Sequence, residues 1–142
     1  MRKRPKALVI DDDEGTRFVL TRALAELGFE VVAVDDGADA PQTVVDEAFD
    51  LLVADLYMPG MNGFELLRRV RQTDGRILPA PQTASTVPII VVSGESQPAS
   101  IANAKRLGAD AYLVKPVDIH ELAATARAVL PAKLVAPSQK TP

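Results

Sequence analysis

The sequence contains no cysteine and only one histidine, His120, among its 142 residues. The lack of cysteine excludes disulfide bonds and thiolate metal sites, and it fits a reducing compartment. The histidine follows a helix-capping aspartate and lacks the charge partner that functional histidines usually have. We therefore interpret His120 as a solvated residue.

Long apolar runs and a charge excess are also missing. The first apolar run, at 7–10, meets four acidic residues at once, so it is too short for a signal-peptide core. No other stretch is long and apolar enough to span a membrane. The formal net charge is −3, which is close to balanced and calls for no nucleic-acid partner. We interpret the basic residues at 1–5 as a solvated flank.

The length suits a single folded domain, which we place at residues 6–130. Short apolar runs alternate with helical patterns along this range. Five strands are predicted, at 7–10, 30–34, 51–54, 89–92 and 112–114. The strands are continuous apolar runs, which indicates an α/β fold with a doubly wound parallel sheet covered on both faces. Residues 131–142 are rich in Lys, Ser, Gln, Thr and Pro, and are expected to form a flexible tail.

Five helices are predicted between and after these strands, each from apolar spacing and end signals. Their markers are Leu20, Ala23, Leu24 and Leu27 before Gly28; Pro41 with Val44, Val45 and Ala48; Phe64, Leu67 and Val70; Pro98 to Leu107 before Gly108; and Asp118 before Ile119, Leu122, Ala123, Ala126 and Leu130. The segment from Thr73 to Thr86 is long for a link between a helix and a strand. We expect it at the opposite end of the sheet from any functional site.

Polar residues follow four of the five strands. They are Asp11-Asp12-Asp13 after the first, Asp55 after the third, Ser93 after the fourth and Lys115-Pro116 after the fifth. Parallel strands bring their carboxyl ends to one edge of the sheet, which is where open sheets of this kind bind ligands. We therefore expect these side chains to share one cleft.

Such a cleft needs a cation. Two carboxylates about 4 Å apart repel by roughly 4 kcal/mol at an effective dielectric near 20, and one lysine cannot neutralise three of them. Oxygen ligands without His or Cys favour Mg²⁺, with Mn²⁺ or Ca²⁺ as other options. A carboxylate beside Mg²⁺ and a lysine can attack phosphorus. Lys115 would then offset charge on the phosphoryl oxygens, and Ser93 could donate a hydrogen bond to one of them.

Each of these residues also has a purely structural interpretation. Aspartate after a strand commonly caps a helix, which is the interpretation we favour for Asp13 and for Asp118. A single lysine is usually a surface charge, and a single serine is usually a turn hydroxyl. Their joint placement at four strand ends favours a functional site.

The sequence strongly resembles the receiver domains of two-component response regulators over nearly its whole length. The most specific match is the run Asp55-Leu-Tyr-Met-Pro-Gly-Met-Asn-Gly63. The acidic pair after the first strand, Ser-Gly-Glu after the fourth, and Gly-Ala-Asp-Ala-Tyr-Leu-Val-Lys-Pro after residue 107 follow in the family's order. The resemblance implies a flavodoxin-like fold with strand order 2-1-3-4-5.

The resemblance also implies a role for each site residue. Asp55 is the phosphoacceptor, and the metal ligands are Asp11, Asp12, Asp55 and the backbone carbonyl of Tyr57. Lys115 contacts the phosphoryl group, and the bond to Pro116 is expected to be cis. Ser93 is the switch hydroxyl and Tyr112 the switch aromatic. Phosphorylation then biases the surface formed by the fourth helix, the fifth strand and the fifth helix between two arrangements.

Partners and location follow from the same resemblance. The phosphoryl donor is a sensor histidine kinase or a histidine phosphotransfer protein, and small acyl phosphates are a further source. Output passes to a downstream protein or to an output domain of a longer regulator. We expect no direct nucleic-acid or membrane contact, a monomer or weak homodimer, and a cytoplasmic location. We also expect no enzyme activity beyond self-phosphorylation and slow self-dephosphorylation. The bulky Tyr57 leads to a further hypothesis, that its ring shields the acyl phosphate from water.

Two other functions compete with this interpretation. A phosphatase of the haloacid-dehalogenase type also uses an aspartate nucleophile, and Asp11-Asp12-Asp13 contains its Asp-x-Asp spacing. That interpretation lacks an acidic pair after Lys115 and leaves the run that begins at Asp55 unexplained. An interaction module with this fold but without phosphorylation is the second alternative. The clustered carboxylates argue against it, because they are costly to keep together without a cation.

Overall fold

The computed structural model of the protein describes residues 4–35, 49–58, 61–71 and 87–131. Its main sheet has five parallel strands in the order β2-β1-β3-β6-β7. They are β1 (Lys6–Ile10), β2 (Glu30–Val34), β3 (Leu51–Ala54), β6 (Ile89–Ser93) and β7 (Ala111–Val114). The predicted fold class and strand order 2-1-3-4-5 are confirmed.

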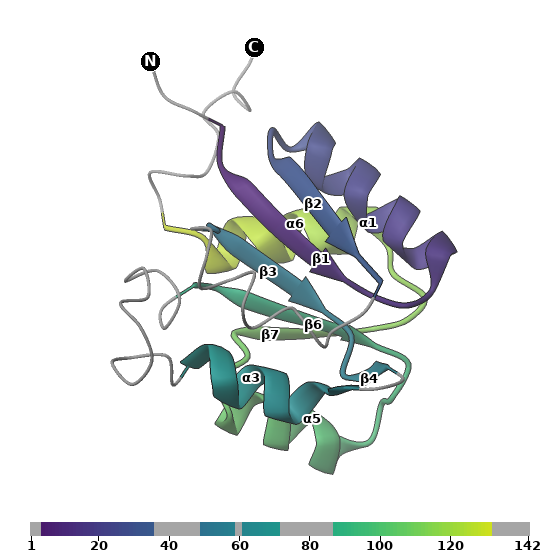
Figure 1. Ribbon diagram of the computed structural model, residues 1–142, viewed down its shortest axis with the longest axis vertical. Helices are drawn as coiled ribbons and strands as arrows, with labels where there is room; N and C mark the ends of the chain where they lie inside the picture. The colour runs from purple at the N-terminus through teal and green to yellow at the C-terminus, as the bar shows by residue number, and fades with distance from the viewer. Residues whose placement is uncertain (1–3, 36–48, 59–60, 72–86, 132–142) are drawn as a thin grey trace.

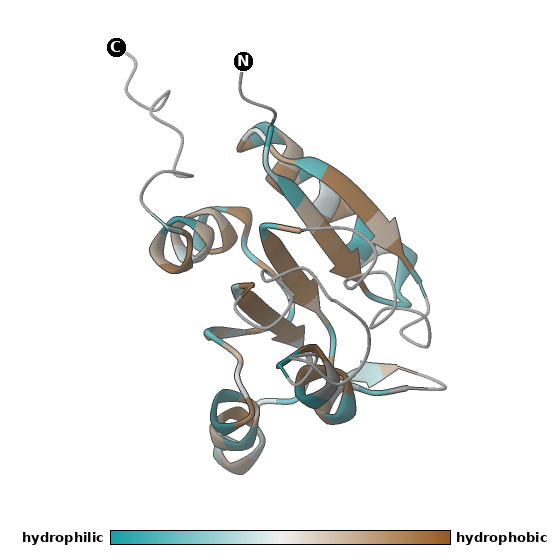
Figure 2. Ribbon diagram, turned by 60° about the vertical axis from the view of Figure 1, so that its left-hand side comes forward, coloured by the Kyte–Doolittle hydropathy of each residue, from teal (hydrophilic) through white to brown (hydrophobic). Residues whose placement is uncertain are grey.

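Helices cover both faces of this sheet (Figure 1). α1 (Glu14–Glu26) and α6 (Ile119–Val129) lie on one face, and α3 (Gly63–Arg71) and α5 (Pro98–Arg106) lie on the other. Each face has its own apolar core, because alternate residues of the buried strands point to opposite sides. In Figure 2 the strands in the middle are the most hydrophobic part of the molecule.

The edge strand β2 is less buried than the sequence pattern suggested. β1, β3 and β6 are almost wholly buried, whereas the residues of β2 range from partly buried to exposed. A strand at the edge of the sheet has one neighbouring strand instead of two, so more of its surface can stay in water. Ile119 is a similar correction: we counted it in the apolar stripe of the last helix, but it is 44% exposed. It is the first residue of α6, ahead of the turn that packs on the sheet.

The helix ends follow the predicted signals. Asp13 caps α1 by accepting from the backbone N–H of Thr16 at 2.8 Å, and Asp118 caps α6 by accepting from the N–H of His120 at 2.7 Å. Gly28 and Gly108 follow α1 and α5 with φ angles of 102° and 120°, which other residues rarely adopt. The two aspartates therefore set where α1 and α6 begin, and the two glycines set where α1 and α5 end.

One element was not predicted. A short antiparallel pair, β4 (Tyr57–Met58) and β5 (Met61–Asn62), follows the third strand. Gly63 comes next, and its N–H donates to the carbonyl of Leu56 at 2.9 Å. The predicted helix that begins near Pro41 and the segment from Thr73 to Thr86 lie outside the described residues. No described helix is long and apolar enough to cross a membrane.

Candidate functional site

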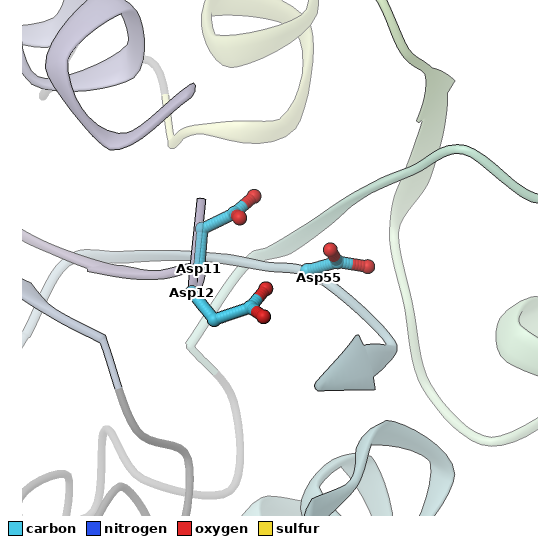
Figure 3. Close-up of side chains that lie close together, drawn as sticks. All are labelled: Asp11, Asp12 and Asp55. Atoms are coloured by element: carbon cyan, nitrogen blue, oxygen red, sulfur yellow. The ribbon is translucent and has the colours of Figure 1, made fainter. Parts of the chain in front are cut away.

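Three carboxylates meet at the carboxyl edge of the sheet. Asp11 and Asp12 directly follow β1, and Asp55 directly follows β3, whose register pairs Ile10 with Ala54. One oxygen from each of the three carboxylates lies within 4.8 Å of the others. Figure 3 shows that the three side chains extend from their two chain segments into a common space. The structure therefore brings together the three acidic side chains predicted from the sequence.

Asp11 is the most buried of the three. Its side chain is fully buried, and its Oδ1 accepts a hydrogen bond from the N–H of Asp13 at 2.9 Å. Its Oδ2 lies 3.1 Å from the Lys115 ammonium but has no hydrogen bond of good geometry. Burial raises the pKa of Asp11, against the opposing effects of the Asp13 N–H and of Lys115. A buried oxygen without a hydrogen bond is the kind of group that a metal ligates.

Asp55 is almost as buried, at 5% exposure, and both of its carboxylate oxygens are engaged. Oδ1 accepts from the N–H of Tyr57 at 3.0 Å, and Oδ2 accepts from the Lys115 ammonium at 2.9 Å. Its own N–H donates to the carbonyl of Ile10 at 3.0 Å, which fixes it against the neighbouring strand. Asp55 is thus a carboxylate held in one orientation.

Lys115 supplies the positive charge of the site. Its ammonium lies 2.9 Å from Asp55 and 3.1 Å from Asp11. Burial lowers the pKa of Lys115, but its hydrogen bonds and charge contacts with the two carboxylates outweigh burial, so the net shift is upward. The backbone holds the residue in place, since its N–H donates to the carbonyl of Ser93 at 2.8 Å. The peptide bond from Lys115 to Pro116 is cis.

Ser93 and Tyr112 lie on adjacent strands and are linked through Glu95. The fully buried Ser93 accepts from the N–H of Glu95 through its hydroxyl oxygen at 3.1 Å. The Tyr112 hydroxyl donates to the carbonyl of Glu95 at 2.7 Å. Burial raises the pKa of the Tyr112 hydroxyl. Glu95, in the loop after β6, is therefore hydrogen-bonded to both of the predicted switch side chains.

Tyr57 links the segment after Asp55 to helix α5. Its ring is 49% exposed and packs edge-on against Phe64, with 6.2 Å between the ring centroids. Its hydroxyl lies 3.4 Å from the hydroxyl oxygen of Ser100 in α5. The position of Tyr57, two residues after Asp55, led us to predict a shielding role, but these contacts were not predicted. The ring also lines an open pocket with Leu56, Met58, Asn62 and Phe64.

Arg17 is a residue that sequence reasoning missed. Its guanidinium donates from Nη1 to the main-chain carbonyl of Asp11 at 2.8 Å. The only signal in the sequence is its spacing, six residues after Asp11 and in the first turn of a helix. Asp13, the third residue of the acidic run, is the helix cap that we expected. His120 is exposed and contributes its backbone N–H to a cap.

The donor set fits a hard divalent cation. Three carboxylates and one ammonium leave two negative charges, and the ligand atoms are all oxygens, which Mg²⁺ prefers. The buried Asp11 oxygen without a hydrogen bond supports the same assignment. Acidic groups at a protein surface often cluster without an ion, but two of these three are buried. The site can hold Mg²⁺ next to an oriented carboxylate and a lysine.

Comparison with known proteins gives a consistent match. The family model described as the response regulator receiver domain matches residues 7–127. The transcriptional regulatory protein AfsQ1 of Streptomyces coelicolor is 34% identical over 126 residues, covering 89% of this chain and 51% of the relative. The chain therefore spans about half the length of that relative.

Solved structures show the same fold. The chemotaxis protein CheY4 of Vibrio cholerae is 30% identical, with a TM-score of 0.77, and the match covers 90% of this chain and 100% of that one. The receiver domain of the sensor histidine kinase PA1611 of Pseudomonas aeruginosa is 23% identical with a TM-score of 0.76, covering 89% of this chain and 98% of that one. The latter structure has a magnesium ion coordinated in its active-site cleft.

Proposed function

This chain belongs to the response regulator receiver domains of two-component signal transduction, and from that membership we propose that Asp55 is its phosphoacceptor. The observation that supports this proposal most is the engagement of both Asp55 oxygens, by Lys115 at 2.9 Å and by the Tyr57 N–H at 3.0 Å. A carboxylate held in one orientation beside a cation is prepared for attack on phosphorus. The domain itself would comprise residues 6–130, with flanks at 1–5 and 131–142.

Receiver domains bind Mg²⁺ at an acidic pocket, and we propose that the ligands here are Asp11, Asp12, Asp55 and the backbone carbonyl of Tyr57. Mn²⁺ has similar ligand preferences and would substitute. When bound, the ion supplies charge neutralisation for the phosphoryl oxygens. The chain's own residues do the rest: Asp11 and Asp12 hold the ion, and Lys115 orients Asp55.

The proposed reaction is a transfer of the phosphoryl group to the carboxylate. A carboxylate oxygen of Asp55 attacks phosphorus, and the new O–P bond forms as the donor's bond to phosphorus breaks. The electron pair of the broken bond leaves with the donor, which is a phosphohistidine or a small acyl phosphate. Lys115 then contacts the phosphoryl oxygens, and the Ser93 hydroxyl donates to one of them.

We propose that the switch acts through Ser93 and Tyr112 on the surface made by α5, β7 and α6. The Tyr112 hydroxyl and the Ser93 hydroxyl both bind Glu95, in the loop that leads into α5. Moving Ser93 toward a phosphoryl group would release the Glu95 N–H and shift that loop. This gives phosphorylation at Asp55 a physical route to α5.

Receiver domains are signalling switches that interact with histidine kinases and downstream partners. For this chain we propose that a sensor histidine kinase or a histidine phosphotransfer protein phosphorylates Asp55. Output would pass to a downstream protein or an attached output domain, without direct nucleic-acid contact. We further propose a cytoplasmic location, a monomer or weak homodimer, and no catalytic turnover beyond self-phosphorylation and slow self-dephosphorylation.

The comparisons give no support to the phosphatase alternative. That function would use the Asp-x-Asp pair Asp11 and Asp13 after β1, but the Asp13 carboxylate caps α1 by accepting from the N–H of Thr16. The second alternative, a module that is never phosphorylated, is separated from our proposal by the experiment that follows.

The deciding measurement is intact mass after incubation with acetyl phosphate, with and without Mg²⁺. We expect the wild type to gain one phosphoryl group only with Mg²⁺, and Asp55→Asn to gain none. Asp118→Asn is a matched control, because it removes a carboxylate from an exposed helix cap and should leave the gain intact. If the wild type gains nothing from acetyl phosphate or from a phosphorylated histidine kinase, the non-phosphorylated module is the correct assignment.

A further inference from the structure

Arg17 lies outside the residues assigned so far, yet it contacts the acidic site directly. Its guanidinium donates to the Asp11 carbonyl at 2.8 Å, and its side chain is partly buried. Its backbone N–H donates to the carbonyl of Asp13 at 2.9 Å, as the first turn of α1 requires. The side chain therefore reaches back from α1 to the end of β1.

This contact acts on Asp12, the exposed member of the three carboxylates. Within the described residues no group donates a hydrogen bond to the Asp12 carboxylate, so its position depends on the two peptide groups that flank it. Arg17 holds the peptide group between Asp11 and Asp12 through the Asp11 carbonyl. The peptide group between Asp12 and Asp13 is held by the N–H of Asp13, which donates to Oδ1 of Asp11 at 2.9 Å.

We propose that Arg17 is a positioning residue for the metal site. By holding the Asp11 carbonyl it fixes the peptide between Asp11 and Asp12, which keeps the Asp12 carboxylate beside those of Asp11 and Asp55. This inference rests on the proposed function, in which the three carboxylates bind Mg²⁺. Outer groups that orient metal ligands commonly account for about 10–100-fold in metal affinity.

Because Arg17 is positively charged, the direction in which its removal changes the Mg²⁺ affinity separates two explanations. A guanidinium beside the site repels a divalent cation. If Arg17 acted by its charge alone, its removal would tighten Mg²⁺ binding. If it acts by holding the backbone, its removal weakens binding in spite of the lost repulsion.

The test is Mg²⁺ binding by titration calorimetry on the full chain, for wild type and Arg17→Ala. We expect Arg17→Ala to weaken Mg²⁺ binding about tenfold. Arg22→Ala is the matched control, because it removes the same charge from the exposed side of α1, where Arg22 lies 3.9 Å from Glu26. That variant should change the affinity by less than about twofold. Unchanged or tighter binding by Arg17→Ala overturns the inference.

Folding is checked by urea unfolding in EDTA. If Arg17→Ala does not fold, Arg17→Gln takes its place, because glutamine keeps most of the apolar stem but is shorter than arginine and does not reach the same carbonyl. Weaker Mg²⁺ binding by Arg17→Gln supports the inference, and unchanged or tighter binding overturns it. A wild type that binds no Mg²⁺ at all instead overturns the proposed function, so the two failures are distinct.

Discussion

The ammonium of Lys115 lies 2.9 Å from Oδ2 of Asp55, although the two residues are 60 positions apart in the chain. The same ammonium lies 3.1 Å from Asp11. One ammonium group thus contacts two buried carboxylates, one directly after β1 and the other directly after β3. Without a metal, this contact is what offsets their repulsion.

Replacing Lys115 by methionine should therefore destabilise the metal-free protein. Removing one partner of a fully buried pair costs about 3–5 kcal/mol, and because this ammonium is partly exposed we expect about 2 kcal/mol. Urea unfolding in EDTA measures the loss. Lys105→Met, on the exposed side of α5, is the control and should change the free energy of unfolding little. Equal effects from both substitutions would contradict the assignment.

Asp11→Asn should have the opposite effect on the metal-free protein. The amide oxygen still accepts from the Asp13 N–H, while one of three clustered negative charges is removed. A like-charge contact near 4 Å costs roughly 4 kcal/mol at an effective dielectric near 20, but the substitution also removes the contact between Asp11 and Lys115 at 3.1 Å, which offsets most of the relief. We expect a net gain of about 1 kcal/mol in urea unfolding with EDTA, together with a loss of Mg²⁺ affinity. A less stable variant would show that the charge of Asp11 is well compensated without metal.

The stabilisation by Asp11→Asn should depend on pH. The pKa of Asp11 is raised in the folded state by burial, so the protonated form is the one that folding favours. The contribution of protonated Asp11 to the free energy of unfolding is fully present below the ordinary carboxyl pKa of 3.8, and it is lost as the pH rises through the folded-state pKa. The advantage of Asp11→Asn should be full above the folded-state pKa of Asp11 and should shrink as the pH falls through that pKa toward 3.8. The control is Asp118→Asn, at an exposed helix cap, with its free energy of unfolding measured at the same pH values.

Tyr57→Asn should shorten the lifetime of the phosphorylated protein. Tyr57 is two residues after the acceptor, and its ring packs against Phe64 with its hydroxyl near Ser100, so we expect the ring to limit the approach of water. A shield worth about 1 kcal/mol in the barrier to hydrolysis corresponds to about a fivefold change in rate. Tyr57→Phe keeps the ring and should keep the lifetime. Decay of the phosphorylated mass is the measurement, and equal decay in wild type and Tyr57→Asn would reject shielding.

Gly63→Ala should destabilise the segment that carries the acceptor. A Cβ at this position would lie 2.3 Å from Cα and 2.5 Å from the carbonyl oxygen of Leu56, so the backbone would have to move. Such overpacking typically costs about 1–3 kcal/mol. Gly15→Ala is the control, because its Cβ would meet only Asp13 at 3.5 Å and alanine favours a helix. Thermal unfolding of the two variants should move in opposite directions.

Much of this architecture could be predicted from the sequence because the signals are local. The apolar runs of β1, β3 and β6 and the caps at Asp13 and Asp118 depend on neighbouring residues only. Parallel pairing then places Asp11, Asp55 and Lys115 at one edge, since strand ends of a parallel sheet meet there. The resemblance to receiver domains supplied the strand order and the roles of the site residues.

Other features were decided by contacts between distant segments. The exposure of Ile119 and the approach of Tyr57 to Ser100 depend on how helices are placed over the sheet. The bond from Arg17 to the Asp11 carbonyl depends on the angle at which α1 leaves β1. Periodicity in a sequence tells which residues share a face, but not how far a side chain extends past its own element. The acidic residues of the site could therefore be predicted from the strand ends, whereas the groups that orient them appeared only when the helices were packed against the sheet.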